Sequence, residues 1–253
     1  MTSNILTHRL AGKVAVITGV SHAGQVGIAL ATAFAWEGAS VAISSRNAER
    51  VKARVEDLLA AQPDIKVIGI AADLTSEEGA RHLVEETLAA YGRIDILVNL
   101  AGGLTKYGPS AELSVADWDS ELNNNLRTTF LCTRAVWPVM QRQGSGKILN
   151  FSRAGGAQSA GPNMAAYNAA KAGVDALTLT FAKEGKEFGI YVNAIGPGLI
   201  VTQSNLDAMH PSPEELATKW VSMEQIIEAA IFLVSSASDG VTGAILPVQG
   251  RGI

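Results

Sequence analysis

The chain has 253 residues, 47% of them hydrophobic, and a formal net charge of -4 at pH 7. The apolar content suffices for one large buried core, and no linker-like segment divides the sequence, so residues 1–253 are expected to form a single domain. The acidic balance offers no basic field for a nucleic acid. No apolar stretch approaches the ~20 residues that span a bilayer, and residues 1–13 lack a signal-type apolar core. We therefore expect a cytoplasmic protein with no membrane partner.

Short β-branched runs alternate with longer helical patterns along the whole chain. The runs predict strands, in chain order, at 14–18, 40–44, 66–71, 94–101, 147–151, 190–195 and 244–248. Helices are expected at about 27–37, 47–61, 76–91, 114–141, 163–188 and 223–236. Most strand runs are apolar throughout, as in strands that are covered on both faces. The alternation predicts an α/β fold, a single-domain Rossmann-type, doubly wound parallel sheet of about seven strands with helices on both faces.

A glycine-rich turn, TGVSHAGQVG at residues 18–27, follows the first predicted strand. Glycines let a backbone approach a pyrophosphate, and the N-terminus of the next helix supplies free N–H groups and a partial positive charge. Glycine also serves ordinary tight turns, so the turn alone is a weak signal. We expect a dinucleotide site that involves seven residues of the turn: Gly19, Ser21, His22, Gly24, Gln25, Val26 and Gly27.

The end of the second predicted strand bears on which dinucleotide binds. Folds that prefer NAD usually place an acidic residue about 20 residues after the turn, where it binds the ribose hydroxyls. This chain has Ser45 and Arg46 there, and its next carboxylate is Glu49. A guanidinium can hold the additional phosphate of NADP with paired hydrogen bonds, whereas a carboxylate would repel it. The pattern favours NADP(H) over NAD(H); the alternative is that Arg46 is a solvated residue at a helix start.

Tyr167 and Lys171 lie four residues apart at the start of a long predicted helix, so they share one face. The positive charge of Lys171 favours the phenolate and would lower the pKa of Tyr167 from its ordinary value of about 10. The pair could then exchange a proton near neutral pH. The spacing alone is weak, because a surface Tyr and Lys on a helix give the same pattern.

Several ordered motifs together make the chain resemble the classical short-chain dehydrogenase/reductase family over almost its whole length. The motifs are LAGKVAVITG from residue 10, AADLT at 71–75, ILVNLAGG at 96–103, WDSELNNNLRTTF at 118–130, YNAAK at 167–171 and YVNAIGPGLIVT at 191–202. An ordered set at family-like intervals is far more specific than any one motif.

The resemblance implies a role for each matching residue. Tyr167 would protonate the carbonyl oxygen during reduction, and Lys171 would lower its pKa and bind the nicotinamide ribose. Asn125 would hold a water that links the lysine to solvent. Asp73 would meet the adenine ring, with Leu74 beside it, and Asn99 would support the central strand and the cofactor. The other implied cofactor contacts are Ala101 and Gly102 after Asn99, and Pro197, Gly198, Ile200 and Thr202 around the nicotinamide and its phosphate.

Three positions depart from the family pattern. The glycine turn is two residues longer than usual, and the extra residues lie within 20–26. Leu100 replaces a second asparagine, which an apolar residue can tolerate. An ungapped alignment places Arg153 at the family's catalytic serine, whereas a shift of one residue places Ser152 there. We favour Ser152, because a hydroxyl can donate a hydrogen bond to the substrate oxygen, with Ser159 as a possible substitute.

The remaining features concern metals, the lid and assembly. The four histidines, at positions 8, 22, 82 and 210, have no metal-ligand spacing, so no metal is expected. Residues 203–220 fall where the family carries a small substrate lid. The resemblance also implies a homo-oligomer, a tetramer or dimer, built with the helices around 114–141 and 163–188 and with the C-terminus.

The leading functional hypothesis is an NADP(H)-dependent oxidoreductase that interconverts a ketone, or a 3-oxoacyl group, and a secondary alcohol. The partner would be a small carbonyl or alcohol substrate. A second hypothesis is a nucleotide-binding sensor or scaffold with little turnover, which Arg153 and the altered turn suggest. Reduction of an enoyl thioester is a third, because related enzymes also have an expanded glycine turn. The spacing of Tyr167 and Lys171 argues against this third hypothesis, because those relatives place the lysine further from the tyrosine.

Overall fold

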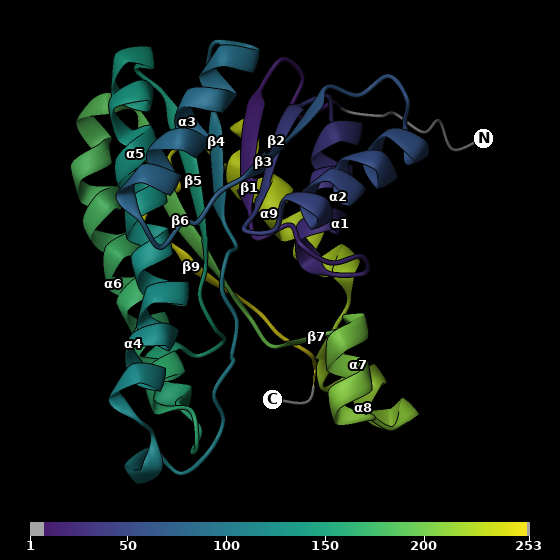
Figure 1. Cartoon of the computed structure of the whole chain (residues 1–253), viewed down its shortest axis with the longest axis vertical. Coiled ribbons are helices and arrows are strands. Elements are labelled where there is room, and N and C mark those ends of the chain that lie inside the picture. The colour runs from purple at the N-terminus through teal and green to yellow at the C-terminus, as the bar shows by residue number, and fades with distance from the viewer. Residues whose placement is uncertain (1–7, 252–253) are drawn as a thin grey trace.

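A seven-stranded parallel sheet lies at the centre of the molecule (Figure 1). The structure is a computed structural model that describes residues 8–251, apart from the side chains at 157 and 158. The strands are β1 (Val14–Thr18), β2 (Ser40–Ser45), β3 (Val67–Ala71), β4 (Ile96–Asn99), β5 (Gly146–Phe151), β6 (Ile190–Pro197) and β9 (Ile245–Val248). Their order is β3-β2-β1-β4-β5-β6-β9. The order reverses between β1 and β4, where such sheets bind ligands beyond the carboxyl ends of the strands.

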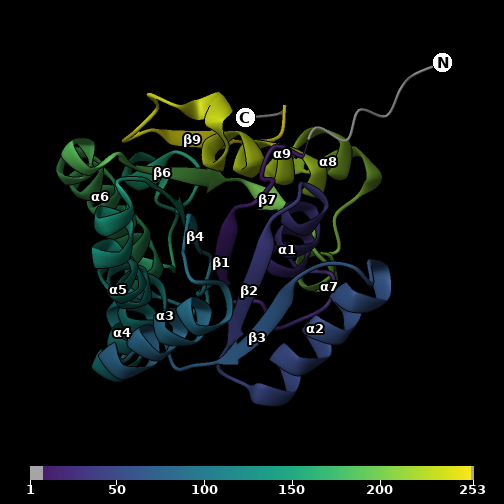
Figure 2. The same ribbon diagram turned by 90° about the horizontal axis from the view of Figure 1, so that it is seen from above.

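Helices cover both faces of the sheet, as Figure 2 shows. One layer holds α1 (Val26–Trp36), α2 (Ala48–Ala61) and α9 (Met223–Val234), which bury Leu30, Val51 and Ile226 in one core cluster. The other layer holds α3 (Glu77–Tyr91), α4 (Val115–Leu122), α5 (Thr128–Gln143) and α6 (Ala165–Gly185), with Leu83, Val136 and Ala182 in a second cluster. The predicted α/β fold with a doubly wound parallel sheet is therefore confirmed.

The predicted helix at 114–141 differs from the structure, because a π-helical turn, η2 (Asn123–Arg127), separates α4 from α5. Side chains bond to main-chain carbonyls on both sides of this turn. Asn125 Nδ2 donates to the Glu121 carbonyl at 3.0 Å, and the Thr128 and Thr129 hydroxyls donate to the carbonyls four residues earlier. Such bonds compete with the regular helical ladder. Single π-helical turns occur often at functional sites.

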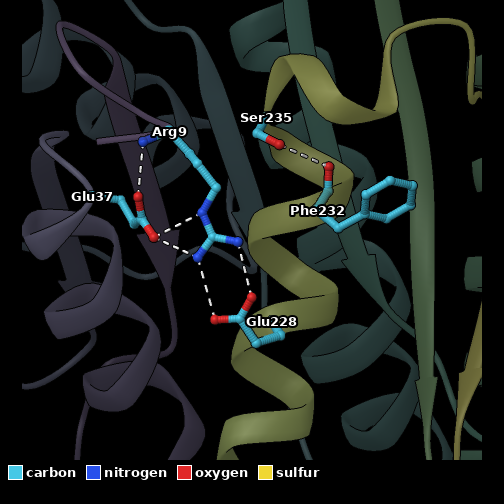
Figure 3. A network of polar contacts seen from close by, with 5 residues as sticks. All are labelled: Arg9, Glu37, Glu228, Phe232 and Ser235. Atoms are coloured by element: carbon cyan, nitrogen blue, oxygen red, sulfur yellow. Dashed lines mark hydrogen bonds and ion pairs between the residues drawn. The ribbon is translucent and has the colours of Figure 1, made fainter. Parts of the chain in front are cut away.

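Arg9 joins two helices of one layer (Figure 3). Its Nε donates to Glu37 Oε1 at 2.8 Å, directly after α1, and its Nη1 donates to Glu228 Oε2 on α9 at 2.9 Å. At the end of α9 the Ser235 hydroxyl donates to the Phe232 carbonyl at 3.2 Å. The Arg9 contacts join the end of α1 to the middle of α9.

A small substructure stands apart from the main layers, beside the carboxyl ends of the strands (Figure 1). It contains α7 (Gln203–Met209), α8 (Pro213–Thr218) and a two-stranded pair of β7 (Leu199–Ile200) and β8 (Trp220–Val221). Residues 203–220, the predicted lid, make up most of it. Within residues 8–251 no helix is long and apolar enough to cross a membrane.

Candidate active site

The glycine turn brings the end of β1 against the loop that follows β4. Gly19 has a φ of 79°, and a Cβ there would lie 2.8 Å from Ala101 Cα, so only glycine fits. Thr18 Oγ1 accepts the N–H groups of Leu100 and Ala101, each at 3.0 Å. The positions after the two central strands are thus held together at the point where strand order reverses.

The N-terminus of α1 carries no cap from its own side chains. Gln25, at the N-cap, makes no side-chain bond to the helix, and the first turn has no acidic residue. By contrast, α2, α3 and α4 begin with capping bonds from Asn47, Ser76 and Ser114. A Cβ at Gly27 would lie 3.2 Å from Val20 Cα, so the turn packs closely on the helix start. Free N–H groups and the positive end of the helix dipole fit the pyrophosphate of a dinucleotide.

The additional residues of the turn contact two neighbouring elements. Gln25 Oε1 accepts a hydrogen bond from the Ser204 hydroxyl on α7 at 3.2 Å. On the other side His22 Nε2 lies 3.2 Å from Arg50 Nη1 on α2. The longer turn therefore reaches both the predicted lid and the helix that follows β2. Arg50 was not among the predicted site residues.

The ends of β2 and β3 place a cation beside a carboxylate. Arg46 is exposed, and its Nη1 donates to Asn124 Oδ1 at 3.4 Å. Asp73 accepts the Thr75 hydroxyl at 2.8 Å, and this bond lowers the pKa of Asp73, with a smaller effect from the positive charge of Arg46. Ser45 is buried at the end of β2. Leu74, after β3, is buried as well.

Asn99 belongs to a chain of buried amide and hydroxyl groups that ties strands to helices. Its Nδ2 donates to Thr133 Oγ1 at 3.0 Å and to Asn150 Oδ1 at 2.9 Å, and Asn150 in turn donates to Thr178 Oγ1 at 2.8 Å. These bonds join β4 and β5 to α5 and α6. Asn99 thus supports the central strands, and its implied contact with the cofactor stays a prediction.

Asn125 holds the loop after β4 against the π-helical turn. Its Oδ1 accepts the Gly103 N–H at 2.8 Å, and its Nδ2 donates to Glu121 Oε2 at 3.2 Å. A Cβ at Gly102 would lie 2.5 Å from Asn125 Oδ1, so the contact requires glycine. Glu121 is fully buried, and its Oε1 accepts the N–H groups of Thr105 at 2.6 Å and of the next residue at 2.8 Å. Sequence reasoning missed Glu121, whose i,i+4 spacing to Asn125 was the available signal.

Tyr167 and Lys171 occupy the first turns of α6, as their spacing predicts. Lys171 Nζ donates to the Phe151 carbonyl at 2.7 Å and lies 5.7 Å from the centre of the Tyr167 ring. Burial lowers the pKa of Lys171 to about 8. Burial raises the pKa of Tyr167, and the charge that opposes this increase comes from Arg153. The direction for Tyr167 is opposite to the one expected from Lys171.

The three candidates for the serine position differ in surroundings. Ser152 is 2% exposed, and its hydroxyl is buried without a hydrogen-bond partner among the described residues. Burial raises the pKa of the nearby Asp175 carboxyl. The Ser159 hydroxyl donates to the Ala154 carbonyl. Arg153 is half-buried, and its Nη1 donates at 2.5 Å to Oδ1 of Asn168, the residue after Tyr167. Of the three, Arg153 is the one whose charge acts on the phenol.

The last predicted contacts follow β6 and lead into the predicted lid. Pro197 ends β6 and Ile200 is buried in β7. Thr202 caps α7, where its Oγ1 accepts the Asn205 N–H at 3.3 Å. Gly198 donates its N–H to the Val248 carbonyl at 2.9 Å. In the described range of the chain no group of three or more His, Cys, Asp or Glu side chains could hold a metal ion.

Comparisons with known proteins agree with this fold. The family model described as Enoyl-(Acyl carrier protein) reductase matches residues 19–250. The crystal structure of levodione reductase superimposes with a TM-score of 0.86 at 31% identity, covering 95% of this chain and 97% of that one. The chain belongs to the short-chain dehydrogenase/reductase family, a family of oxidoreductases that use nicotinamide cofactors.

Two curated relatives cover nearly the whole chain. The (2S)-[(R)-hydroxy(phenyl)methyl]succinyl-CoA dehydrogenase subunit BbsD of Thauera aromatica is 37% identical over 94% of this chain and 95% of the relative. The 3-oxoacyl-[acyl-carrier-protein] reductase FabG of Thermotoga maritima is 34% identical over 96% of this chain and 98% of the relative.

Proposed function

We propose that the protein is an NADP(H)-dependent oxidoreductase that interconverts a ketone, or a 3-oxoacyl group, and a secondary alcohol. The observation that carries the proposal is the joint presence of Tyr167, Lys171 and Asn125 beyond the carboxyl ends of the central strands. The names of the relatives support the substrate class, since FabG reduces a 3-oxoacyl thioester and BbsD is a dehydrogenase of an acyl-CoA.

A nicotinamide cofactor held by the glycine turn and Arg46 would supply the hydride that the carbonyl carbon receives in the reductive direction. As the C=O π bond becomes a C–H bond and an O–H bond, the Tyr167 hydroxyl donates its proton to the carbonyl oxygen. Lys171, with a pKa of about 8, exchanges protons near neutral pH and can restore the phenol. Asn125, whose side chain binds the Gly103 backbone, would hold a water that links the lysine to solvent. In the oxidative direction the proton transfer is reversed, and Tyr167 accepts the proton of the alcohol.

The preference for NADP(H) rests on cations around the start of α2. Arg46 stands at the position that usually carries an acidic residue in NAD-binding folds. Arg50 lies on α2 itself, beside His22 of the glycine turn. Two guanidinium groups at this end would hold the additional phosphate of NADP with charge-assisted hydrogen bonds. A lower KM for NADPH than for NADH is the expected result.

The experiment measures oxidation of NADPH and NADH with a panel of ketones, 3-oxoacyl thioesters and enoyl thioesters. Tyr167→Phe is expected to lower kcat by roughly a hundredfold or more, because general acid catalysis contributes about 10²–10⁴-fold. Tyr107→Phe, at a tyrosine that is 68% exposed, is the matched control. Full activity of Tyr167→Phe would contradict the mechanism. Binding of NADPH without turnover of any carbonyl would favour a sensor, and turnover confined to enoyl thioesters would favour an enoyl reductase.

We also propose that the protein is a homo-oligomer, as family resemblance implies. Exposed apolar side chains lie on the helices expected at the interface: Trp118 on α4, Phe130 on α5 and Leu179 on α6. Burial of these side chains between copies would remove apolar surface from water.

A further inference from the structure

We propose that Arg153 binds a carboxylate of the substrate, so that the favoured substrates are ketones that carry a free carboxylate close to the carbonyl. The proposal rests on the proposed function and deepens it by naming the substrate class. It makes Arg153 a specificity-determining residue, at the position that an ungapped alignment gives to the family's catalytic serine.

The first observation is where Arg153 lies. Its guanidinium donates to Oδ1 of Asn168, the neighbour of Tyr167 on α6, at 2.5 Å. Asn168 is itself held, because its Nδ2 donates to the Gly161 carbonyl at 2.9 Å. The charge of Arg153 is also the one that lowers the pKa of the Tyr167 phenol against the effect of burial. The guanidinium is therefore held at the start of α6, near enough for its charge to act on the phenol that would meet the substrate oxygen.

The second observation is that the backbone of Arg153 is fixed. The main-chain bonds between β5 and β6 continue on both sides of it, with the Ser152 N–H donating to the Ile195 carbonyl at 2.8 Å and the Ala154 N–H donating to the Pro197 carbonyl at 3.0 Å. A Cβ at Gly196 would lie 2.7 Å from the Arg153 carbonyl oxygen, so the two backbones are in close contact. The backbone is thus anchored, and the bond to Asn168 holds the guanidinium at the other end of the side chain.

The third observation is the partner that Arg153 has. Within the described part of the chain, Arg9 and Arg93 pair with carboxylates, whereas no acidic side chain lies within ion-pair distance of Arg153. Its amide partner is neutral. A guanidinium has five N–H donors in a planar fork that matches a carboxylate. A half-buried cation without a counter-charge is costly, and an anionic ligand would remove that cost.

Two nearby carboxylates do not fill this role. Glu121 accepts the N–H groups of the loop after β4, and its charge raises the pKa of Tyr167. Asp175 lies near Ser152 and Lys171, further along α6. Neither is within ion-pair distance of Arg153, so the guanidinium remains available to an incoming anion.

The test compares acids with their neutral esters on one carbon skeleton: pyruvate, acetoacetate and levulinate, each against its methyl ester, with NADPH. The wild type is expected to favour the acid of at least one pair by roughly tenfold or more in kcat/KM, as for a charge-assisted bidentate contact. Arg153→Gln should lower that acid-to-ester ratio by a similar factor. The ratio cancels any effect of the variant on Tyr167 that both substrates share. Arg153→Lys, which keeps the charge, should retain part of the preference.

Arg142→Gln, at an exposed arginine near the end of α5, is the matched control and should leave the ratio unchanged. Thermal melts of each variant check folding. An acid-to-ester ratio near one in every wild-type pair, or an unchanged ratio in Arg153→Gln, would overturn the proposal.

A binding measurement separates this proposal from the proposed function. Calorimetric titration of the same acids and esters into the protein with NADP+ requires no turnover. Tighter binding of an acid to the wild type, lost in Arg153→Gln, supports the carboxylate site even if no carbonyl is reduced, in which case the proposed function alone fails. Equal or undetectable binding of acids and esters overturns the carboxylate site.

Discussion

Burial and charge act in opposite directions on Tyr167 and its neighbours. Burial raises the pKa of the phenol, while Arg153 lowers it, and burial lowers the pKa of Lys171 to about 8. The lysine is thereby brought closer to neutrality than an exposed lysine would be, at a cost to folding when it is charged. This cost is measurable.

Lys171→Met is expected to remove a pH dependence of stability that the wild type shows above pH 8. Between pH 8 and 10.5 the unfolded chain holds the lysine proton and the folded chain has lost it. The free energy of unfolding of the wild type therefore rises with pH over that window relative to the variant, by up to about 3 kcal/mol. The pH dependence is the test, because the lost bond to the Phe151 carbonyl adds a cost that pH does not change.

Urea unfolding at several pH values from 7 to 10.5 measures this difference. Lys183→Met, at an exposed lysine on the same helix, is the control and should show no comparable trend. Parallel stability curves for the wild type and Lys171→Met would refute the argument.

At the residue scale the sequence predicted the positions of Tyr167, Lys171 and Asn125 on helices, because the motifs are local and helical spacing is regular. The surroundings of Arg153 could not be predicted, since Asn168 and Tyr167 lie on α6, across the loop that follows β5. The contact of Glu121 with Thr105 could not be predicted either, because it joins residues that are 16 apart in the sequence.

At the scale of elements, the Arg9 contacts give the layer of α1 and α9 a pH-dependent stability. Arg9 lowers the pKa of Glu228 through a hydrogen bond. For Glu37 burial acts in the raising direction, and the bonds from Arg9 outweigh it. The stabilisation is present above the ordinary carboxyl pKa of 4.5 and is lost as the pH falls through the lowered values.

Arg9→Met is therefore expected to lower the free energy of unfolding at pH 7 by about 1–2 kcal/mol, a value that allows for partial exposure. The loss should shrink as the pH is lowered below 4. Thermal and urea unfolding measure it. Lys219→Met, which removes an exposed pair with Glu215, should change stability by less than about 0.5 kcal/mol. Equal losses for the two variants would show that Arg9 contributes no more than a surface pair.

The strands of the main sheet were predictable because each is a short apolar run, and the inner strands β1, β2, β4, β5 and β6 are largely buried between two layers. The division of the helix at 114–141 was not, because it depends on which side chains of η2 bond to carbonyls. The start of α8 carried a readable signal: Ser212 and Glu215 form a capping box, and Pro213 is the first helical residue.

At the scale of the whole molecule, the proposed oligomer predicts which exposed aromatic side chains matter for assembly. Phe130→Glu on α5 is expected to reduce the mass measured by sedimentation, because a charge would be buried in the interface. Trp36→Glu, at a 54% exposed tryptophan on α1 in the opposite layer, is the control and should leave the mass unchanged. An identical mass for wild type and Phe130→Glu would remove this face from the interface.

The contact between Gln25 and Ser204 couples the longer glycine turn to the predicted lid. The bond joins the loop proposed for the cofactor to the helix proposed for the lid, so ligands at the two places share one equilibrium. If a bound dinucleotide raises the affinity of the site under the lid for substrate, the bound substrate must raise the affinity for the dinucleotide by the same factor. One exposed neutral hydrogen bond is worth about 1 kcal/mol, which limits this reciprocal effect to roughly fivefold.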